Sequence, residues 1–223
     1  MTDLLPIVAL SLKTALAATL LILPPGVWLG WLLARRNFPG KTLLEGLVNI
    51  PLVLPPVVTG YALLFALSPA SPAGRFLENH LGLQIAFAWP GAVLAAAVVS
   101  FPLLVRAVRV AVSSVSPGLE EAASVLNAPA WAVWLQITLP LSAHGILGGM
   151  LLAFARALGE FGATIVLASN IPARTQTIPL AIFTFLNQPG GEAHIWPLVL
   201  FSLILAYASL LLNEVLIRRI HHA

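Results

Sequence analysis

Long apolar runs, separated by short polar segments, extend over almost the whole chain. A helix that crosses a bilayer needs roughly 20 mostly apolar residues, and five stretches of this sequence reach that length. The predicted spans are Thr14–Ala34, Leu44–Leu67, Ile85–Val108, Leu141–Ala168 and Trp196–Ile217. The pattern predicts an all-α fold, a polytopic transmembrane helix bundle in which residues 1–223 form a single domain.

The composition is that of a protein embedded in the lipid bilayer. The 223 residues are 59% hydrophobic and only 9% charged, whereas a soluble domain carries about 25% charged residues. The mean hydropathy is +0.97. The net charge of +3 comes from scattered basic residues, which excludes nucleic acid as a partner. The absence of cysteine excludes disulfides and thiolate chemistry.

Side chains that could carry catalysis are few and dispersed. The acidic residues are too scattered for paired general acid and base work. The histidines lack metal-ligand spacing within one element, and no glycine loop with a lysine could hold phosphate. We therefore expect no catalytic residue, no metal site and no cofactor, and the chain cannot hydrolyse ATP by itself.

Lysine and arginine positions predict the orientation, because positively charged loops stay in the cytoplasm. One set of loops and helix ends holds seven basic residues: Arg35, Arg36, Lys41, Arg106, Arg109, Arg218 and Arg219. The opposite side holds three, namely Lys13, Arg75 and Arg174. This asymmetry predicts an N-terminus outside, a C-terminus in the cytoplasm, and a cytoplasmic loop between the third and fourth spans.

That loop, at about 113–140, is predicted to contain a short helix over Leu119–Leu126. Ser116 is suited to cap the helix, and Pro117 suits its first position. Glu120 and Glu121 lie in the first turn, where the helix dipole favours carboxylates.

The end of this short helix is predicted at Asn127, since asparagine enters the left-handed backbone region readily. Pro129 then prevents a simple continuation. An amphipathic segment follows, and Pro140 opens the fourth span. An ordinary amphipathic connector lying on the membrane is the alternative interpretation of the whole loop.

The spacing within the loop is more specific. Glu121-Ala122-Ala123 is followed after three residues by Asn127, and after nine more by Ile137-Thr138-Leu139-Pro140. This resembles the cytoplasmic loop of ABC-importer permeases, with Asn127 where that family has glycine. The resemblance implies a coupling helix that docks into a groove on a cytoplasmic ATPase. The residues that it assigns to coupling are Glu120, Glu121, Ala122, Ala123, Asn127 and Pro140.

Further stretches resemble the permease subunit of molybdate importers, notably Leu52–Tyr61, Leu152–Thr164 and Ser169–Pro172. Sulfate/thiosulfate permeases share Arg156–Gly162, so a permease for those anions is the alternative. Molybdate and tungstate are not separated by the sequence. The resemblance implies a multi-pass protein of the cell inner (cytoplasmic) membrane. It also implies a homodimer of permeases, two cytoplasmic ABC ATPase subunits and an extracytoplasmic molybdate-binding protein.

Two features inside the predicted spans are candidates for the translocation pathway. Arg156 and Glu160 are four residues apart and would share a helical face deep in the bilayer. We favour a structural pair there, because a carboxylate facing the path would repel a dianion. The second feature is Pro55-Pro56 followed by Thr59, where a kink frees backbone carbonyls and a hydroxyl lies nearby. A kink needed only for helix packing is the alternative.

Two other classes of function remain to be weighed against an importer permease. An intramembrane enzyme would need a nucleophile or metal ligands gathered at one depth, and the predicted spans lack them. A channel without a motor would conduct without ATP and would not co-purify with an ATPase subunit.

Overall fold

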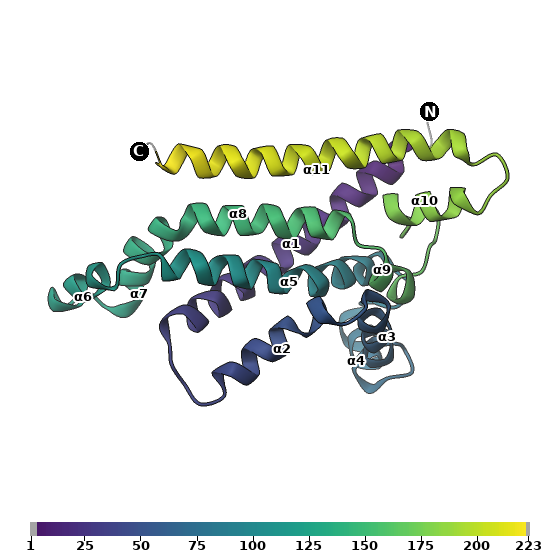
Figure 1. The fold of residues 1–223 in the computed structure, drawn as a ribbon. Helices are drawn as coiled ribbons and strands as arrows, with labels where there is room; N and C mark the ends of the chain where they lie inside the picture. Colours follow the sequence, from purple (N-terminus) through teal and green to yellow (C-terminus); the bar gives the residue numbers. More distant parts are fainter. Residues whose placement is uncertain (1–3, 222–223) are drawn as a thin grey trace.

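The structure, a computed structural model, describes residues 4–221, and every regular element in that range is helical. The predicted all-α class is therefore confirmed (Figure 1). The α-helices are α1 (Leu4–Arg35), α2 (Lys41–Val53), α3 (Pro56–Leu67), α4 (Pro72–Leu81), α5 (Trp89–Ser113), α6 (Pro117–Val125), α7 (Ala130–Val133), α8 (Leu139–Leu158), α9 (Gly162–Leu167), α10 (Ile178–Leu186) and α11 (Glu192–His221). A π-helical turn, η1 (Trp134–Thr138), joins α7 to α8.

Within residues 4–221, four helical stretches are long and apolar enough to cross a membrane. They are α1, α5, the continuous stretch Ala130–Leu158, and Glu192–Ser209 within α11. Helices α2 and α3 qualify only as a pair, and they are bent by 112° at the break between them. The five predicted spans thus correspond to four continuous helical candidates and one bent pair.

The predicted second span, Leu44–Leu67, is wrong as one continuous helix. It breaks where Leu54 and Pro55 both adopt extended backbone, with ψ of 143° and 133°. A residue that precedes proline is disfavoured in the helical region, and here two consecutive residues precede a proline. The chain therefore leaves α2 and restarts as α3 in another direction.

Prolines inside two other long helices do not interrupt them. Pro24 and Pro25 lie inside α1, and Pro102 lies inside α5. Both helices continue through them because they pack against each other along their length, which holds the chain helical despite the lost hydrogen bonds.

The predicted fourth span, Leu141–Ala168, is likewise divided. Helix α8 ends at Leu158, and α9 begins at Gly162. Arg156 consequently lies in the last turn of α8, and Glu160 lies beyond the end of that helix. The expectation that the two share one helical face is wrong, although their side chains still meet.

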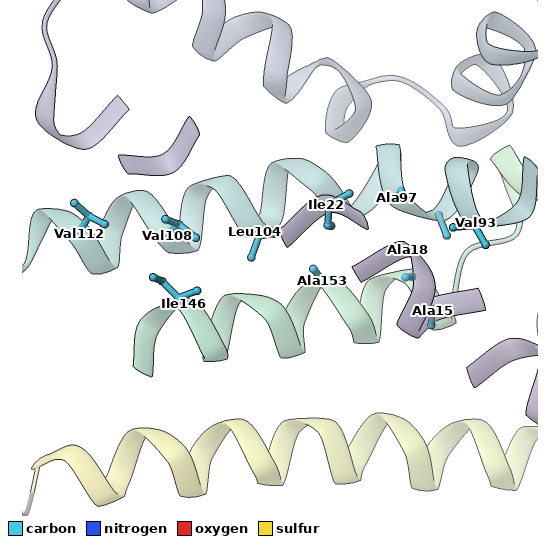
Figure 2. Close-up of a cluster of buried hydrophobic side chains, with 12 residues drawn as sticks. Ala15, Ala18, Ile22, Val93, Ala97, Leu104, Val108, Val112, Ile146 and Ala153 are labelled. Carbon is cyan, nitrogen blue, oxygen red and sulfur yellow. The ribbon is translucent and has the colours of Figure 1, made fainter. Parts of the chain in front are cut away.

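The main core lies where α1, α5 and α8 cross, and it is built largely from small side chains. Figure 2 shows Ala15 and Ala18 of α1, Leu104 of α5 and Ala153 of α8 directed toward one another. Helices in lipid associate through close contact of small residues rather than through the hydrophobic effect. At Gly30 of α1, a Cβ atom would lie 2.6 Å from Val108 Cγ1, so only glycine permits this approach.

This three-helix core separates two ends of the molecule. Helices α6 and α7 lie at one end of α5 and α8, whereas α3, α4, α9 and α10 lie toward the other (Figure 1). Helix α8 has 20 residues and, at 1.5 Å per residue, is about 30 Å long. The predicted coupling residues and the predicted pathway residues are therefore held at opposite ends of one rigid element.

Candidate functional site

Helix α6 begins at Pro117 as its sequence predicts, with Glu120 in the first turn near the positive end. Glu121 lies just beyond that turn, so its predicted place in the first turn is wrong. Its bounds, Pro117–Val125, lie close to the expected Leu119–Leu126. Ser116 is the N-cap residue, but its side chain makes no capping hydrogen bond, so that part of the prediction is wrong.

The end of α6 depends on Asn127, whose φ of 58° lies in the left-handed region as predicted. The Ala128 N–H donates to Ala123 O at 3.1 Å, and the Asn127 N–H donates to Ser124 O at 3.0 Å. This pair of bonds forms a Schellman motif, which satisfies carbonyls that the helix end would otherwise leave free. Asn127 thus makes the left-handed turn that the sequence predicts at this position.

Glu120 ties α6 to two helices that are distant in the sequence. Its Oε1 accepts hydrogen bonds from Arg35 Nε at 3.1 Å and from Thr138 Oγ1 at 2.6 Å. Arg35 Nη2 lies 3.0 Å from the same oxygen and also donates to Val115 O at 2.8 Å. Charge-assisted bonds of this kind are stronger than neutral ones. Helix α6 is therefore fixed to the end of α1 and to η1.

The next residue, Glu121, is exposed and has no ion pair or hydrogen-bond partner for its side chain within residues 4–221. Ala122 is exposed beside it, and Val125 and Leu126 are each 82% exposed. Adjacent residues on a helix point about 100° apart, so Glu120 faces the protein while Glu121 faces away. Helix α6 therefore combines a fixed inner face with an uncovered outer face.

Pro140 is the second residue of α8, which follows the widened turn η1. The Leu139 N–H bonds to Trp134 O, five residues back, which is the π-helical pattern. Proline has no N–H, and its ring clashes with the carbonyl four residues earlier in an α-helix. The wider turn relieves this clash, so Ala130–Leu158 continues through Pro140 instead of starting there.

At the opposite end of α8, the two helix breaks meet. A Cβ atom on Gly60 of α3 would lie 2.7 Å from Ala163 O of α9. A Cβ atom on Gly162 would lie 2.8 Å from Pro56 Cβ. The starts of α3 and α9 are thus in direct contact, which brings residues of the second and fourth predicted spans together.

Glu160 organises this junction of α3 and α9. Its side chain is 2% exposed, its Oε2 lies 2.8 Å from Arg156 Nη1, and its Oε1 accepts the Ala163 N–H at 2.8 Å. The carboxylate therefore links the end of α8 to the first turn of α9. A buried carboxylate with these two partners is neutralised and hydrogen-bonded, as burial in an apolar environment requires.

Thr59 lies one turn into α3, next to Gly60, and is 6% exposed. Its Oγ1 is buried and has no hydrogen-bond partner among the described residues. Pro55 is exposed at the break, one residue before the contact made by Pro56. Four predicted pathway residues thus belong to the junction: Pro56, Thr59, Arg156 and Glu160.

Sequence reasoning missed the partners that fix α6. Arg35 contributed only to the predicted membrane orientation, and Thr138 only occupied a variable position of the loop motif. A second missed contact is the 3.0 Å ion pair between Arg109 Nη1 and Glu45 Oε1, which joins α5 to α2. None of these pairs has a local spacing signal, because their members lie on different elements. No cluster of three or more potential metal ligands occurs within the searched part of residues 4–221.

The family model described as "Binding-protein-dependent transport system inner membrane component" matches residues 26–222. The molybdenum transport system permease protein ModB of Haemophilus influenzae is 51% identical over 210 residues, covering 94% of this chain and 92% of that protein. The sulfate transport system permease protein CysW of Escherichia coli is 39% identical over 180 residues, covering 81% of this chain and 62% of that protein.

A solved structure has the same fold. The inward facing MetNI methionine ABC transporter aligns with a TM-score of 0.68 at 15% sequence identity, covering 98% of this chain and 94% of the matched chain. At that identity the likeness concerns the arrangement of helices.

We expect Glu120→Ala to loosen α6, because it leaves the partly buried Arg35 guanidinium without its carboxylate. The loss of stability should be about 1–3 kcal/mol, measured by thermal unfolding, and the amides of α6 should exchange hydrogen faster. Glu121→Ala is the matched control, and its effect should stay within about 0.5 kcal/mol. Equal effects of the two substitutions would contradict the assigned network.

Proposed function

The chain belongs to the family of binding-protein-dependent transport system inner membrane components, and we propose that it is the permease subunit of a molybdate importer. The 51% identical relative is named for molybdenum transport and is matched over nearly its whole length. The sulfate permease is more distant, at 39% identity, and is matched over 62% of its length. Molybdate is therefore preferred to sulfate or thiosulfate as the transported anion.

Membership of this family has consequences for location and partners. The protein is a multi-pass component of the inner membrane, and it acts as a transport subunit with ATPase and binding-protein partners. It is not itself an enzyme, since ATP hydrolysis belongs to a separate subunit of such transporters. We further propose one permease domain over residues 1–223, paired as a homodimer with two ATPase subunits below and a molybdate-binding protein above.

The observation that carries the proposal of a permease coupled to an ATPase is the combination of a fixed inner face and an uncovered outer face on α6. Glu120 holds the helix against Arg35 and Thr138, while Glu121 and Ala122 remain exposed. A surface that must accept force from a partner has to be both accessible and rigidly attached. We assign Glu121, Ala122 and Ala123 to docking on the ATPase, and Asn127 to the shape of the turn.

Movement of α6 has a direct route into the membrane-spanning helices. Glu120 contacts the end of α1 through Arg35 and the start of the α8 stretch through Thr138. Because α1, α5 and α8 share the core in Figure 2, a displacement of α6 acts on a packed body rather than on a loose loop. This attachment supports alternating access driven by closure of the ATPase subunits. It requires α6 in the cytoplasm, hence the N-terminus outside and the C-terminus inside.

The junction of α3 and α9 is our candidate for part of the translocation pathway. Non-helical backbone at membrane depth is tolerated where protein surrounds it or where it lines a water-filled cavity. Glu160 neutralises Arg156 there, so the pair adds little net charge to attract or trap a dianion. The buried Thr59 hydroxyl has an unused donor and can offer a passing oxyanion a hydrogen bond. Such a site favours passage over tight binding.

We expect Glu121→Lys to uncouple ATP hydrolysis from transport, because it reverses the charge of the exposed docking face. The protein should still insert in the membrane, and molybdate uptake in cells that hold the binding protein should fall about tenfold or more, the loss of roughly 1.4 kcal/mol of coupling. Glu78→Lys makes the same charge change on the exposed face of α4 and should leave uptake unchanged. Normal accumulation by the Glu121→Lys cells would exclude a docking role for α6.

We expect Thr59→Val to reduce molybdate uptake roughly tenfold, since a hydrogen bond to a charged group contributes about 1.5–3 kcal/mol. The same substitution should leave the melting temperature unchanged or higher, because it removes a buried hydroxyl without a partner. Ser100→Ala is a control at a hydroxyl already bonded to Ala96 O, and transport should be retained there. Full uptake with Thr59→Val would remove that hydroxyl from the pathway.

The choice of anion is tested in the reconstituted complex. We expect binding protein loaded with molybdate to stimulate ATP hydrolysis, with sulfate failing to compete at equal concentration. Stimulation by sulfate-loaded binding protein alone would replace molybdate with sulfate as the cargo. Conduction by the isolated chain without ATP, together with failure to co-purify with an ATPase, would point instead to a channel.

A further inference from the structure

Two cavities meet where the end of α1 lies beside α7 and η1. The first is polar, has a volume of about 250 Å³ and includes Arg35, Arg36 and Glu120 in its wall. The second is apolar, has a volume of about 250 Å³ and is walled mainly by four tryptophans: Trp28, Trp31, Trp131 and Trp134. Trp31 and Trp134 belong to both walls, so the two cavities form one hollow, called here the Trp–Arg hollow.

The aromatic half of the Trp–Arg hollow is open to the surroundings. Trp28 is 60% exposed and Trp131 is 66% exposed. Trp28, Trp31 and Arg35 follow one another at helical spacing along α1, so they lie on one face. Seven residues of helix from Trp28 to Arg35 rise about 10 Å. Indole rings at one end of this stretch can therefore contact the upper acyl chains of a bilayer while the arginine at the other end reaches the headgroups.

The polar half of the Trp–Arg hollow carries a positive charge that the protein does not neutralise. Arg35 is paired with Glu120, so these two charges cancel. Arg36 also lines the cavity, and its guanidinium has no ion pair or hydrogen bond among residues 4–221. An anionic group entering the cavity would meet Arg36 without displacing an existing partner.

We infer that the Trp–Arg hollow binds one anionic phospholipid, with its phosphate at Arg36 and its acyl chains against Trp28 and Trp131. Basic pockets beside transmembrane helices on the cytoplasmic side attract anionic headgroups, and exposed indole rings suit the membrane interface. A soluble anion would leave the tryptophan faces uncovered, whereas an amphiphile covers both halves at once. Only the assignment of this hollow to the cytoplasmic leaflet rests on the proposed function.

The lipid would lie against the elements that hold α6. Trp134 is the first residue of η1, Thr138 is its last, and Arg36 directly follows the arginine that binds Glu120. An occupied Trp–Arg hollow therefore fills the space beside the Arg35–Glu120–Thr138 network and supports the turn that carries it. The lipid composition of the inner leaflet would therefore affect how firmly α6 is held.

The test is native mass spectrometry of the purified full-length chain in detergent, titrated with phosphatidylglycerol or phosphatidylcholine of the same acyl chains. We expect the wild type to retain one phosphatidylglycerol per chain at least about fivefold better than phosphatidylcholine, the effect of about one basic residue near an anionic headgroup. Arg36→Gln should abolish this preference, and Arg36→Lys should keep most of it. Arg75→Gln, at an exposed arginine of α4, is the matched control and should change nothing.

The aromatic half is tested by Trp131→Ala, which should lower retention of both lipids while leaving their ratio unchanged. Equal retention of the two lipids by the wild type, or an unaltered preference in Arg36→Gln, would overturn the inference. Displacement of phosphatidylglycerol by millimolar inorganic phosphate would indicate a free-phosphate site instead. Its release on addition of the partner ATPase would indicate a protein-covered surface. Because ATP hydrolysis and uptake do not enter the measurement, a failure here is separate from a failure of the proposed transport function.

Discussion

The carboxylate of Glu120 is the contact on which the attachment of α6 to the rest of the protein depends. It joins α6 to Arg35 at the end of α1 and to Thr138 at the start of the α8 stretch. Without that contact, α6 would lose its side-chain bonds to α1 and to η1. With it, force applied to the exposed face of α6 reaches two of the three helices that form the core. A short surface helix thereby becomes part of the transmembrane body.

A second constraint shapes the opposite end of the molecule. Backbone groups freed at a helix break must find partners at membrane depth. The chain meets this requirement by placing its two breaks together, so that α9 packs on α3 through Gly60 and Gly162. Glu160 then accepts an amide from the first turn of α9 while pairing with Arg156. A charged pair that would be costly alone in lipid therefore links α8 to α9. The Thr59 hydroxyl at this junction has no hydrogen-bond partner among the described residues.

At the end of α1, an ion pair within the protein lies beside the Trp–Arg hollow. Arg35 and Arg36 are neighbours, yet one is neutralised by Glu120 and the other is not. The tryptophans beside them belong to the same helices, α1 and α7–η1, that receive α6. On the functions proposed above, docking of the ATPase and binding of a lipid would act on adjoining residues. The π-turn, which Pro140 makes necessary, places Trp134 and Thr138 at the boundary between these two surfaces.

The sequence by itself determined the features that depend on local chemistry. Apolar length located the candidate membrane-spanning segments but not the breaks within two of them, while Pro117 located the start of α6 and Asn127 its left-handed end. Tertiary structure decided the rest. Proline removes a hydrogen bond wherever it occurs, but Pro24-Pro25 stays helical against α5 while Pro55 lies at a 112° bend. Glu120 and Glu121 look alike in sequence, and only folding brings Arg35, 85 residues away, and Thr138, 18 residues away, to the first of them. Such pairings have no local signal, because packing between helices alone decides which face is covered.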